Sequence, residues 1–369
     1  MKEDPNWRRK PDSLSGLREE IDRVDEEILS LLTRRQAAAH AIGRMKAEQG
    51  MDVFDPVREK EVLQKLISLS DGNLSGEHTR NIFREIISAS RSVQQPLNVA
   101  FLGPAGTFTH EAALSLFGHS TSFQPAESIE GVFSMVEKDL CRQGIVPIEN
   151  SCEGSVHTTM DLFSRYDLKV CGEVFLRIRH HLLSLEQSRE EIKTVYSHPM
   201  AIAQCRSWIM ANLPGVHVKE VESTSAAALR ASREKGAAAI GSGLSARVYH
   251  LDRVVGNIED NPDNVTRFLC IAKTDAPPTG RDKTSVLFHL NHKPGALHRA
   301  LGALAEKGIN VSRIESRPAK MKKWEYLFFI DLEGHYLDER LSKAIPELEK
   351  QCVFVKRLGS YPAGDGLWK

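Results

Sequence analysis

Two cations and two neutral polar residues fall on helix faces that the hydrophobic pattern marks as buried. Extending a 3.6-residue apolar period from the N-terminal region places Arg35 and Lys46 on the apolar face, about 20° apart around the axis. Ser90 and Gln94 continue the apolar face of a later helical segment. Because buried charges need partners, the pattern predicts a site for an anionic ligand. The alternative is a structural network in which Arg35 or Lys46 pairs with Asp55.

A second group of polar residues follows short apolar strands in the middle of the chain. The string V-P-I-E-N-S ends one strand with Glu149, Asn150 and Ser151, and Y-S-H-P ends another with Ser197. Thr266 opens an apolar run within N-V-T-R-F. Ligands of open α/β sheets bind at the carboxyl ends of strands. Each string alone is more often a turn or a helix cap, but together they predict a ligand cleft.

The elements that carry the first group are helices. Residues 12–95 predict three helices and no strand, and Asp55-Pro56 predicts the start of the second. The first helix carries an apolar stripe, which comprises Leu14, Leu17, Ile21, Val24, Ile28, Leu31 and Leu32. Such a thin hairpin buries little core alone, so we expect it to pair with a second copy.

The second group lies in an α/β region. Five strand candidates alternate with helical segments: Leu97–Leu102, Gly144–Ile148, Thr194–Ser197, Val216–Val221 and Ala237–Ile240. The β-rich stretches 168–185 and 257–272 are predicted to cross between two lobes that clamp a ligand. Residues 274–280 are a linker by composition, and the pattern beyond them is β-α-β-β-α-β, a ferredoxin-like module.

Composition limits the partners and the compartment. Basic and acidic residues number 49 each, so no bulk charge favours nucleic acid or membrane. No apolar run approaches the roughly 20 residues that span a bilayer, and the N-terminus lacks a signal-peptide core, so we expect a cytoplasmic protein. The six cysteines form no C-x-x-C pair, and His110-Glu111 lacks a second histidine at zincin spacing, so we expect neither metal nor disulfides.

Two glycine-rich strings could hold anions. G-P-A-G-T-F, from Gly103, follows a strand and opens a helix, where backbone N–H groups can bind a carboxylate or phosphate. G-S-G-L-S-A, from Gly241, fits G-x-G-x-x-A, with Glu259 placed where a ribose could be bound. This second string raises a nicotinamide-dependent enzyme as an alternative, although an isolated match is a weak signal.

Residues 14–95 resemble the all-helical chorismate mutase domain. In that family two domains interlock as an intertwined dimer, and Arg18 would reach into the partner's site. The resemblance implies that Arg35 and Arg18 hold the carboxylates of chorismate, while Lys46 and Gln94 donate to its ether oxygen. The full implied chorismate site comprises Arg18, Arg35, Lys46, Asp55, Arg58, Ser90 and Gln94.

Residues 97–275 resemble prephenate dehydratase through G-P-A-G-T-F, V-P-I-E-N-S, Y-S-H-P, E-S-T-S-A-A and V-T-R-F. The resemblance implies a two-lobed α/β domain like that of periplasmic binding proteins, with Thr266 essential. We expect Thr266 to assist departure of the ring hydroxyl, with Glu149 or water replenishing its proton. The implied prephenate-binding residues are Asn150, Ser151, Ser197, Gln204, Ser223, Arg267 and Phe268.

Residues 283–361 resemble an ACT domain, a ferredoxin-like amino-acid sensor. Two strings carry the family's phenylalanine-binding pattern, although His298 replaces its usual aliphatic residue. The implied effector residues are Gly295, Ala296, Leu297, Asn310, Glu315, Ser316, Arg317 and Pro318. On fold grounds alone, a mere dimerisation module is the alternative.

The three resemblances together predict a bifunctional enzyme of phenylalanine synthesis. Its domains would be 1–95, 96–275 and 282–361. It would convert chorismate to prephenate and then to phenylpyruvate without a cofactor, as a homodimer or tetramer inhibited by phenylalanine. The alternative from another class is a non-catalytic clamp that binds an aromatic acid and signals through the ACT domain.

Overall fold

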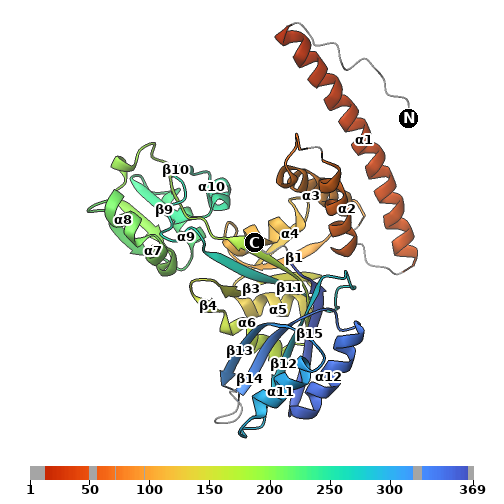
Figure 1. Cartoon of the computed structure of the whole chain (residues 1–369). Helices are drawn as coiled ribbons and strands as arrows, with labels where there is room; N and C mark the ends of the chain where they lie inside the picture. The colour runs from red at the N-terminus through yellow and green to blue at the C-terminus, as the bar shows by residue number, and fades with distance from the viewer. Residues whose placement is uncertain (1–12, 50–55, 71, 95, 319–325, 365–369) are drawn as a thin grey trace.

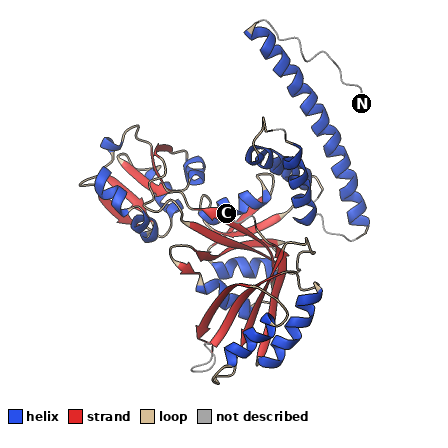
Figure 2. Ribbon diagram, in the orientation of Figure 1, coloured by secondary structure: helices blue, strands red, loops and turns tan. Residues whose placement is uncertain are grey.

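The computed structural model describes residues 13–49, 56–70, 72–94, 96–318 and 326–364. They form a helical part, two α/β lobes and a C-terminal sheet covered by two helices (Figure 1). Figure 2 shows the three sheets, which belong to the two lobes and to the C-terminal module.

The helical part consists of α1 (Leu14–Glu48), α2 (Pro56–Leu69) and α3 (Gly76–Ser92). The prediction of three helices is therefore confirmed. Ser13 and Ser75 cap α1 and α3, each accepting a hydrogen bond of 3.1 Å from a backbone N–H of the first turn. Asp55, the predicted cap of α2, lies outside the described residues.

The apolar stripe of α1 is not covered by the described residues of one chain. The N-terminal half of α1 extends beyond α2 and α3 (Figure 1), and Leu14, Ile21 and Ile28 are 67%, 59% and 48% exposed. Nearer its C-terminal end, Gln36 Nε2 donates to Ala89 O of α3 at 3.1 Å. An exposed apolar stripe of this kind is typical of an interaction surface, and pairing with a second copy stays a prediction.

The first lobe contains a mixed sheet in the order β2-β1-β3-β11-β5, with β4 beside β3. Its strands are β1 (Asn98–Leu102), β2 (Ser122–Ala126), β3 (Gln143–Asn150), β4 (Gly154–Ser155), β5 (Lys169–Arg177) and β11 (Val265–Ala272). Its helices are α4 (Phe108–Phe117), α5 (Ile129–Glu137) and α6 (His157–Arg165). β2 was not among the predicted strands. It contains Pro125 and is an edge strand, where proline is tolerated.

The second lobe contains a sheet in the order β10-β6-β9-β7-β8. Its strands are β6 (His181–Ser184), β7 (Thr194–Ser197), β8 (His217–Glu220), β9 (Ala237–Gly241) and β10 (Asp252–Val255). Its helices are α7 (Pro199–Gln204), α8 (Arg206–Asn212), α9 (Thr224–Ala231), α10 (Gly243–Tyr249) and a short 3-10 turn (Arg189–Glu191). The chain crosses between lobes from β5 to β6 and returns from β10 to β11, which confirms the predicted two-lobed arrangement.

The C-terminal module is a four-stranded antiparallel sheet in the order β13-β14-β12-β15. Its elements are β12 (Asp282–His289), α11 (Ala296–Ala305), β13 (Val311–Pro318), β14 (Tyr326–Glu333), α12 (Glu339–Gln351) and β15 (Phe354–Pro362). This is the predicted ferredoxin-like order. One face of the sheet packs on α11 and α12, through residues such as Val286, Ile330 and Leu348.

The other face of this sheet packs directly on the first lobe. Leu287, Phe329 and Leu358 share one buried cluster with Phe163 and Val170 of the lobe. Gly359 lies so close that a Cβ there would stand 2.2 Å from Val170 O, and its φ of +143° also favours glycine. The module and the lobe therefore share a hydrophobic core.

The helical part is held to the first lobe mainly through α3. The Arg91 guanidinium, 4% exposed, donates to Phe117 O at the end of α4 and pairs with Glu59 of α2 at 2.7 Å. Gly118 follows Phe117 in the chain, and a Cβ atom at Gly118 would lie 2.5 Å from Ser88 Cβ of α3. None of the helices in the described ranges combines the length and the apolar character needed to cross a bilayer.

Candidate active sites

A cavity of about 380 Å³ lies between the two lobes. Thr266 and Phe268 of β11 and Asn150 of β3 form one wall, and Gln204 and Ser223 of the second lobe contribute to the other. These five residues were predicted to bind prephenate or to act on it. The structure therefore brings them together in the cleft between the lobes, where the α/β pattern predicts a ligand.

The hydrogen bonds around Thr266 fix how its hydroxyl can act. Asn150 Oδ1 accepts from the backbone N–H groups of Cys152 and Glu153, at 2.9 and 3.0 Å. The amide must therefore present Nδ2 to Thr266 Oγ1, 2.8 Å away. Because Oγ1 accepts this bond, the Thr266 hydroxyl proton remains available to a bound substrate.

The hydrogen bonds of Asn150 continue to two residues that were not predicted, Asn264 and His180. Asn150 Nδ2 also donates to Asn264 Oδ1 at 2.7 Å, and Asn264 Nδ2 donates to Gln204 Oε1 at 3.1 Å. His180 Nε2 lies 2.9 Å from the same Gln204 oxygen. Burial lowers the pKa of His180, outweighing opposite effects of Gln204 and Glu259. His180 is therefore neutral near pH 7 and donates from Nε2.

Helix N-termini add backbone donors to this cavity. Thr107 and Phe108 at the start of α4, and Ser223 and Thr224 at the start of α9, line it. First-turn N–H groups and the helix dipole favour anions. The cavity thus suits a ligand with carboxylates, in agreement with the anion role predicted for the G-P-A-G-T-F string.

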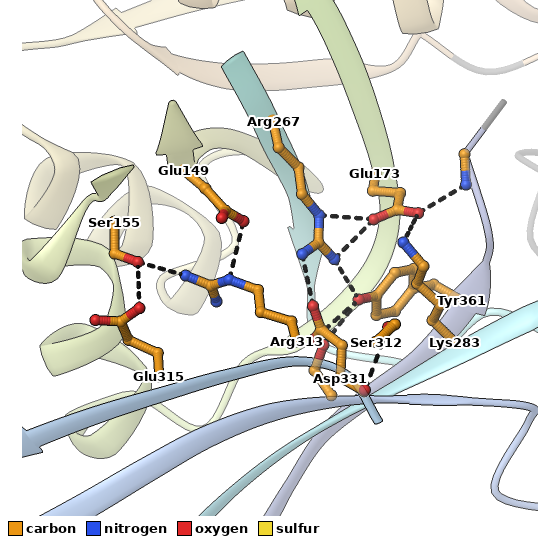
Figure 3. A network of polar contacts seen from close by, with 12 residues as sticks. Glu149, Ser155, Glu173, Arg267, Lys283, Ser312, Arg313, Glu315, Asp331 and Tyr361 are labelled. Carbon is orange, nitrogen blue, oxygen red and sulfur yellow. Dashed lines mark hydrogen bonds and ion pairs between the residues drawn. The ribbon is translucent and has the colours of Figure 1, made fainter. Parts of the chain in front are cut away.

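Two predicted active-site residues lie on the opposite face of the sheet. Glu149 Oε2 pairs with Arg313 Nε of β13 at 2.9 Å, and Arg267 is buried between β5 and the C-terminal module (Figure 3). Successive side chains of a strand alternate between faces. Since Asn150 and Thr266 face the cavity, their neighbours Glu149 and Arg267 face away. In this structure Glu149 is therefore not placed to return a proton to Thr266, and Arg267 does not line the cavity.

Two further predicted prephenate contacts also lie outside the lining of the cavity. Ser197 is fully buried and donates to Ile240 O at 2.7 Å, so it joins β7 to β9. Ser151 Oγ accepts from Val265 N at 3.0 Å and joins the ends of β3 and β11. Both hydroxyl groups hold neighbouring strands together. The short motifs alone could not show this role.

The helical part collects a smaller cluster. Arg35 Nη1 donates to Ser90 Oγ and, at 3.4 Å, to Ile86 O, and Gln94 packs against Gly43 of α1. Burial lowers the pKa of the Arg35 guanidinium, opposed by Glu59. Ser90 is 4% exposed. These contacts bring Arg35, Ser90 and Gln94 together between α1 and α3.

The remaining predicted chorismate residues are less enclosed. Lys46 is half-buried near the end of α1, and Arg58 on α2 is exposed and pairs with Glu61 at 3.1 Å. Arg18 is exposed on the projecting half of α1, about 25 Å along the axis from Arg35. A single small ligand cannot touch both arginines of one chain. Asp55 lies outside the described residues.

The eight residues predicted to bind phenylalanine occupy different places. Gly295, in a left-handed conformation, and Ala296 and Leu297 lie at the start of α11. Asn310 lines a surface hollow beside β14. The remaining four lie on β13, whose alternate residues face different ways: Glu315 and Arg317 face the first lobe, and Ser316 and Pro318 are exposed. Their role stays a prediction.

Comparison with known proteins gives the relationship of the whole chain. Residues 99–276 match the prephenate dehydratase family, residues 17–95 match chorismate mutase type II, and residues 284–352 match the ACT domain. The chain is 48% identical to a bifunctional chorismate mutase/prephenate dehydratase from Aquifex aeolicus and 41% identical to one from Pseudomonas aeruginosa. Each alignment covers 95% of this chain and 98% of the relative. The chain belongs to the bifunctional chorismate mutase/prephenate dehydratase family.

Membership in this family confirms the predicted three-part fold and the two predicted activities, and it does not favour the non-catalytic clamp. A crystal structure of a prephenate dehydratase from Arthrobacter aurescens, in complex with L-Phe, is 34% identical and superposes with a TM-score of 0.67. The match covers 72% of this chain and 90% of that one.

The string that suggested a nicotinamide site has another role in this family member. Ser242 Oγ and Ser245 Oγ of G-S-G-L-S-A donate to Gly106 O in the other lobe, at 2.9 and 2.8 Å. Glu259, considered for a ribose, pairs with Arg179 at 2.6 Å and accepts from His180 N at 2.9 Å. The string therefore joins the two lobes.

Proposed function

We propose that Thr266 is the proton donor of the dehydratase reaction and that prephenate binds in the cavity between the lobes. The observation that carries this proposal is the bond from Asn150 Nδ2 to Thr266 Oγ1. It turns the Thr266 hydroxyl into a directed donor at a site that buried strands hold in place. A donor of fixed direction suits a leaving oxygen.

The proposed reaction expels hydroxide and carbon dioxide together. The electrons of the bond to the departing carboxyl group enter the ring, the ring becomes aromatic, and the bond to the ring hydroxyl breaks. Thr266 gives its proton to that oxygen, which leaves as water. Threonine is a weak acid, so it must regain a proton from water or from a carboxyl group.

The source of that returning proton differs from the sequence-based hypothesis. Glu149 faces Arg313, whereas Glu127 and Glu222 line the cavity. Water or one of these two carboxyl groups therefore replaces Glu149 in the proposal. The substrate carboxylates would bind at the starts of α4 and α9, and aromatisation supplies the driving force without a cofactor.

For the mutase reaction, we propose a site made by two chains. Arg35, Ser90 and Gln94 of one chain would bind chorismate together with Lys46, and Arg18 would come from the second chain. The rearrangement is unimolecular and needs only orientation and stabilisation of charge on the ether oxygen. The protein would act as a cytoplasmic homodimer or tetramer.

We further propose that phenylalanine inhibits the dehydratase by binding the ACT domain. The similar prephenate dehydratase from Arthrobacter aurescens was crystallised in complex with L-Phe. In this chain, Glu315 accepts from Ser155 Oγ at 2.8 Å, so the predicted effector strand directly contacts the first lobe. An effector bound there would act on β3 and β4.

The proposal is tested by Thr266→Ala and Thr266→Ser in a coupled assay starting from chorismate. Loss of the hydroxyl should lower the turnover of prephenate by about 10²- to 10³-fold, and serine should restore it to within about tenfold of wild type. Formation of prephenate from chorismate on the same chain is the internal control and should not change. Near-normal phenylpyruvate formation by Thr266→Ala would refute the role of Thr266.

A further inference from the structure

Thr266 has a neighbour whose burial the reaction does not explain. Arg267 follows it in β11, is 5% exposed and faces away from the cavity. A guanidinium withdrawn from water requires partners that compensate its charge. Its partners come from both the dehydratase domain and the ACT domain, at the back of the strand that carries Thr266.

Each nitrogen of the Arg267 side chain has a partner (Figure 3). Nε donates to Glu173 Oε2 of β5 at 2.7 Å, and Nη1 donates to Asp331 Oδ2 of β14 at 2.5 Å. Nη2 donates to Tyr361 OH of β15 at 3.0 Å and lies 2.7 Å from Glu173. One side chain thus joins β11 to one strand of its own lobe and to two strands of the ACT sheet.

The cluster is closed and balanced in charge. Lys283 Nζ of β12 pairs with Glu173 at 2.8 Å, so two cations face two carboxylates. Asp331 also accepts from Ser285 Oγ at 2.5 Å and is fully buried. Burial alone would raise the pKa of Asp331, but Arg267 and Ser285 outweigh it and hold that pKa below its usual range. Asp331 is therefore charged whenever Arg267 is in place.

The cluster lies where β11 is irregularly paired. Arg267 stands opposite Glu149 of β3, but Phe268 stands opposite Pro147, so the pairing skips Ile148. Such a bulge re-aims nearby side chains, and a slip of one residue would exchange the two faces of the strand. Thr266 would then turn from the cavity toward the ACT domain. The charged contacts of Arg267 with Glu173 and Asp331 oppose this slip.

From these contacts we infer that Arg267 is a positioning residue for the dehydratase reaction, holding Thr266 toward the cavity through its pair with Asp331 of the ACT domain. This inference rests on the proposed role of Thr266. It also means that the ACT sheet contributes to catalysis without touching the substrate. A purely structural ion pair would affect stability, whereas a positioning residue affects turnover through Thr266.

The test compares Arg267→Lys, Thr266→Ala and the double variant in the full chain. Lysine keeps the charge but cannot join three partners, so kcat for prephenate should fall by about tenfold or more with KM within about threefold of wild type. In the Thr266→Ala background, Arg267→Lys should change kcat by less than about twofold, because both act through one hydroxyl. Arg357→Lys is the matched control, since Arg357 also crosses this boundary, to Asp275, and should leave kcat unchanged.

A milder variant keeps the inference testable if Arg267→Lys does not fold. Tyr361→Phe removes only the hydroxyl that meets Arg267 Nη2, and should lower kcat by about threefold without raising KM. Tyr336→Phe, in the same domain but outside the cluster, should have no effect.

Three results would overturn the inference. They are wild-type kcat in both Arg267→Lys and Tyr361→Phe, a raised KM with unchanged kcat, and losses that multiply fully in the double variant. Thr266→Ala alone tests the proposed function, so failure of one proposal is distinguishable from failure of the other.

Discussion

In the cleft between the lobes, one chain supplies both walls, whereas in the helical domain one chain leaves the site open. Thr266, Asn150 and Gln204 line one cavity although they are distant in the sequence. Arg35 and Ser90 also meet, but Arg18 is exposed on the half of α1 that extends beyond α2 and α3. The difference follows from the core each region can bury.

The lobes each enclose a sheet, so their strand ends are fixed before any partner arrives. The described residues of the helical domain form no sheet, and within them the longest helix buries only Ala39 and Gly43. An apolar stripe on such a helix is stabilised only when another surface covers it. We therefore expect the mutase site to depend on association, and the dehydratase cleft to depend on it much less.

Among the changes that separate the two sites, substitution of Arg35 has the largest expected effect. Arg35→Ala should lower mutase turnover by about 10²- to 10³-fold, because the carboxylate fork and its charge are lost. Dehydratase turnover with added prephenate should stay unchanged. Both rates are measured on one preparation.

The matched control is Gln36→Ala. Gln36 also bonds α3, donating to Ala89 O and accepting from Ser90 Oγ, but it belongs to no predicted chorismate site. If Gln36→Ala cost as much mutase activity as Arg35→Ala, the role of Arg35 would be structural, and the cluster would be the network that the sequence left open as an alternative.

The sequence alone predicted those helices, strands and cleft residues that a short local pattern determines. Helical periodicity predicted α1 to α3, and five strands of the two lobes were predicted near their observed bounds. Motifs could also indicate that Thr266 and Asn150 belong to one cleft. These features depend on local propensity and on the common location of ligands at strand ends.

The predictions that differ from the structure concern the face of the strand on which a side chain lies. Glu149 and Arg267 are each one residue from a cavity residue, and a motif does not state which side of the sheet its members occupy. Their partners, Arg313 and Asp331, lie in another domain, 164 and 64 residues away. Only the packed structure shows that these charges join domains.

A substitution in the apolar stripe tests whether the mutase site depends on association of two chains more than the dehydratase cleft does. Val24→Asp should weaken pairing and lower mutase activity by about tenfold or more at low protein concentration, because burying an unpaired carboxylate is costly. Dehydratase activity should stay within about threefold of wild type. Sedimentation and both rates are measured over a dilution series.

Ser30→Asp is the control for that substitution. It adds the same charge to the same helix, on an exposed position outside the stripe. Unchanged mutase activity in a Val24→Asp protein shown to be a monomer would contradict the dependence on a second chain.

The smallest expected effect is the change with pH in the stability of the two lobes. Burial lowers the pKa of His180, and also of His110 and His181, and all three lie in the two lobes. Above their unfolded pKa of about 6.5, neither state is protonated and the histidines add no pH dependence. As pH falls below that value, the unfolded chain binds protons that the folded domain resists, so the free energy of unfolding decreases.

We therefore expect the melting midpoint of the lobes to fall by a few degrees between about pH 7 and pH 5. His180→Gln should reduce this slope, because glutamine keeps a donor toward Gln204 and binds no proton in this range. His217→Gln, on an exposed position of β8, removes an imidazole from the same lobe and should leave the slope as it is. Equal slopes in all three proteins, measured by thermal unfolding at each pH, would show that His180 does not cause the pH dependence of the lobes.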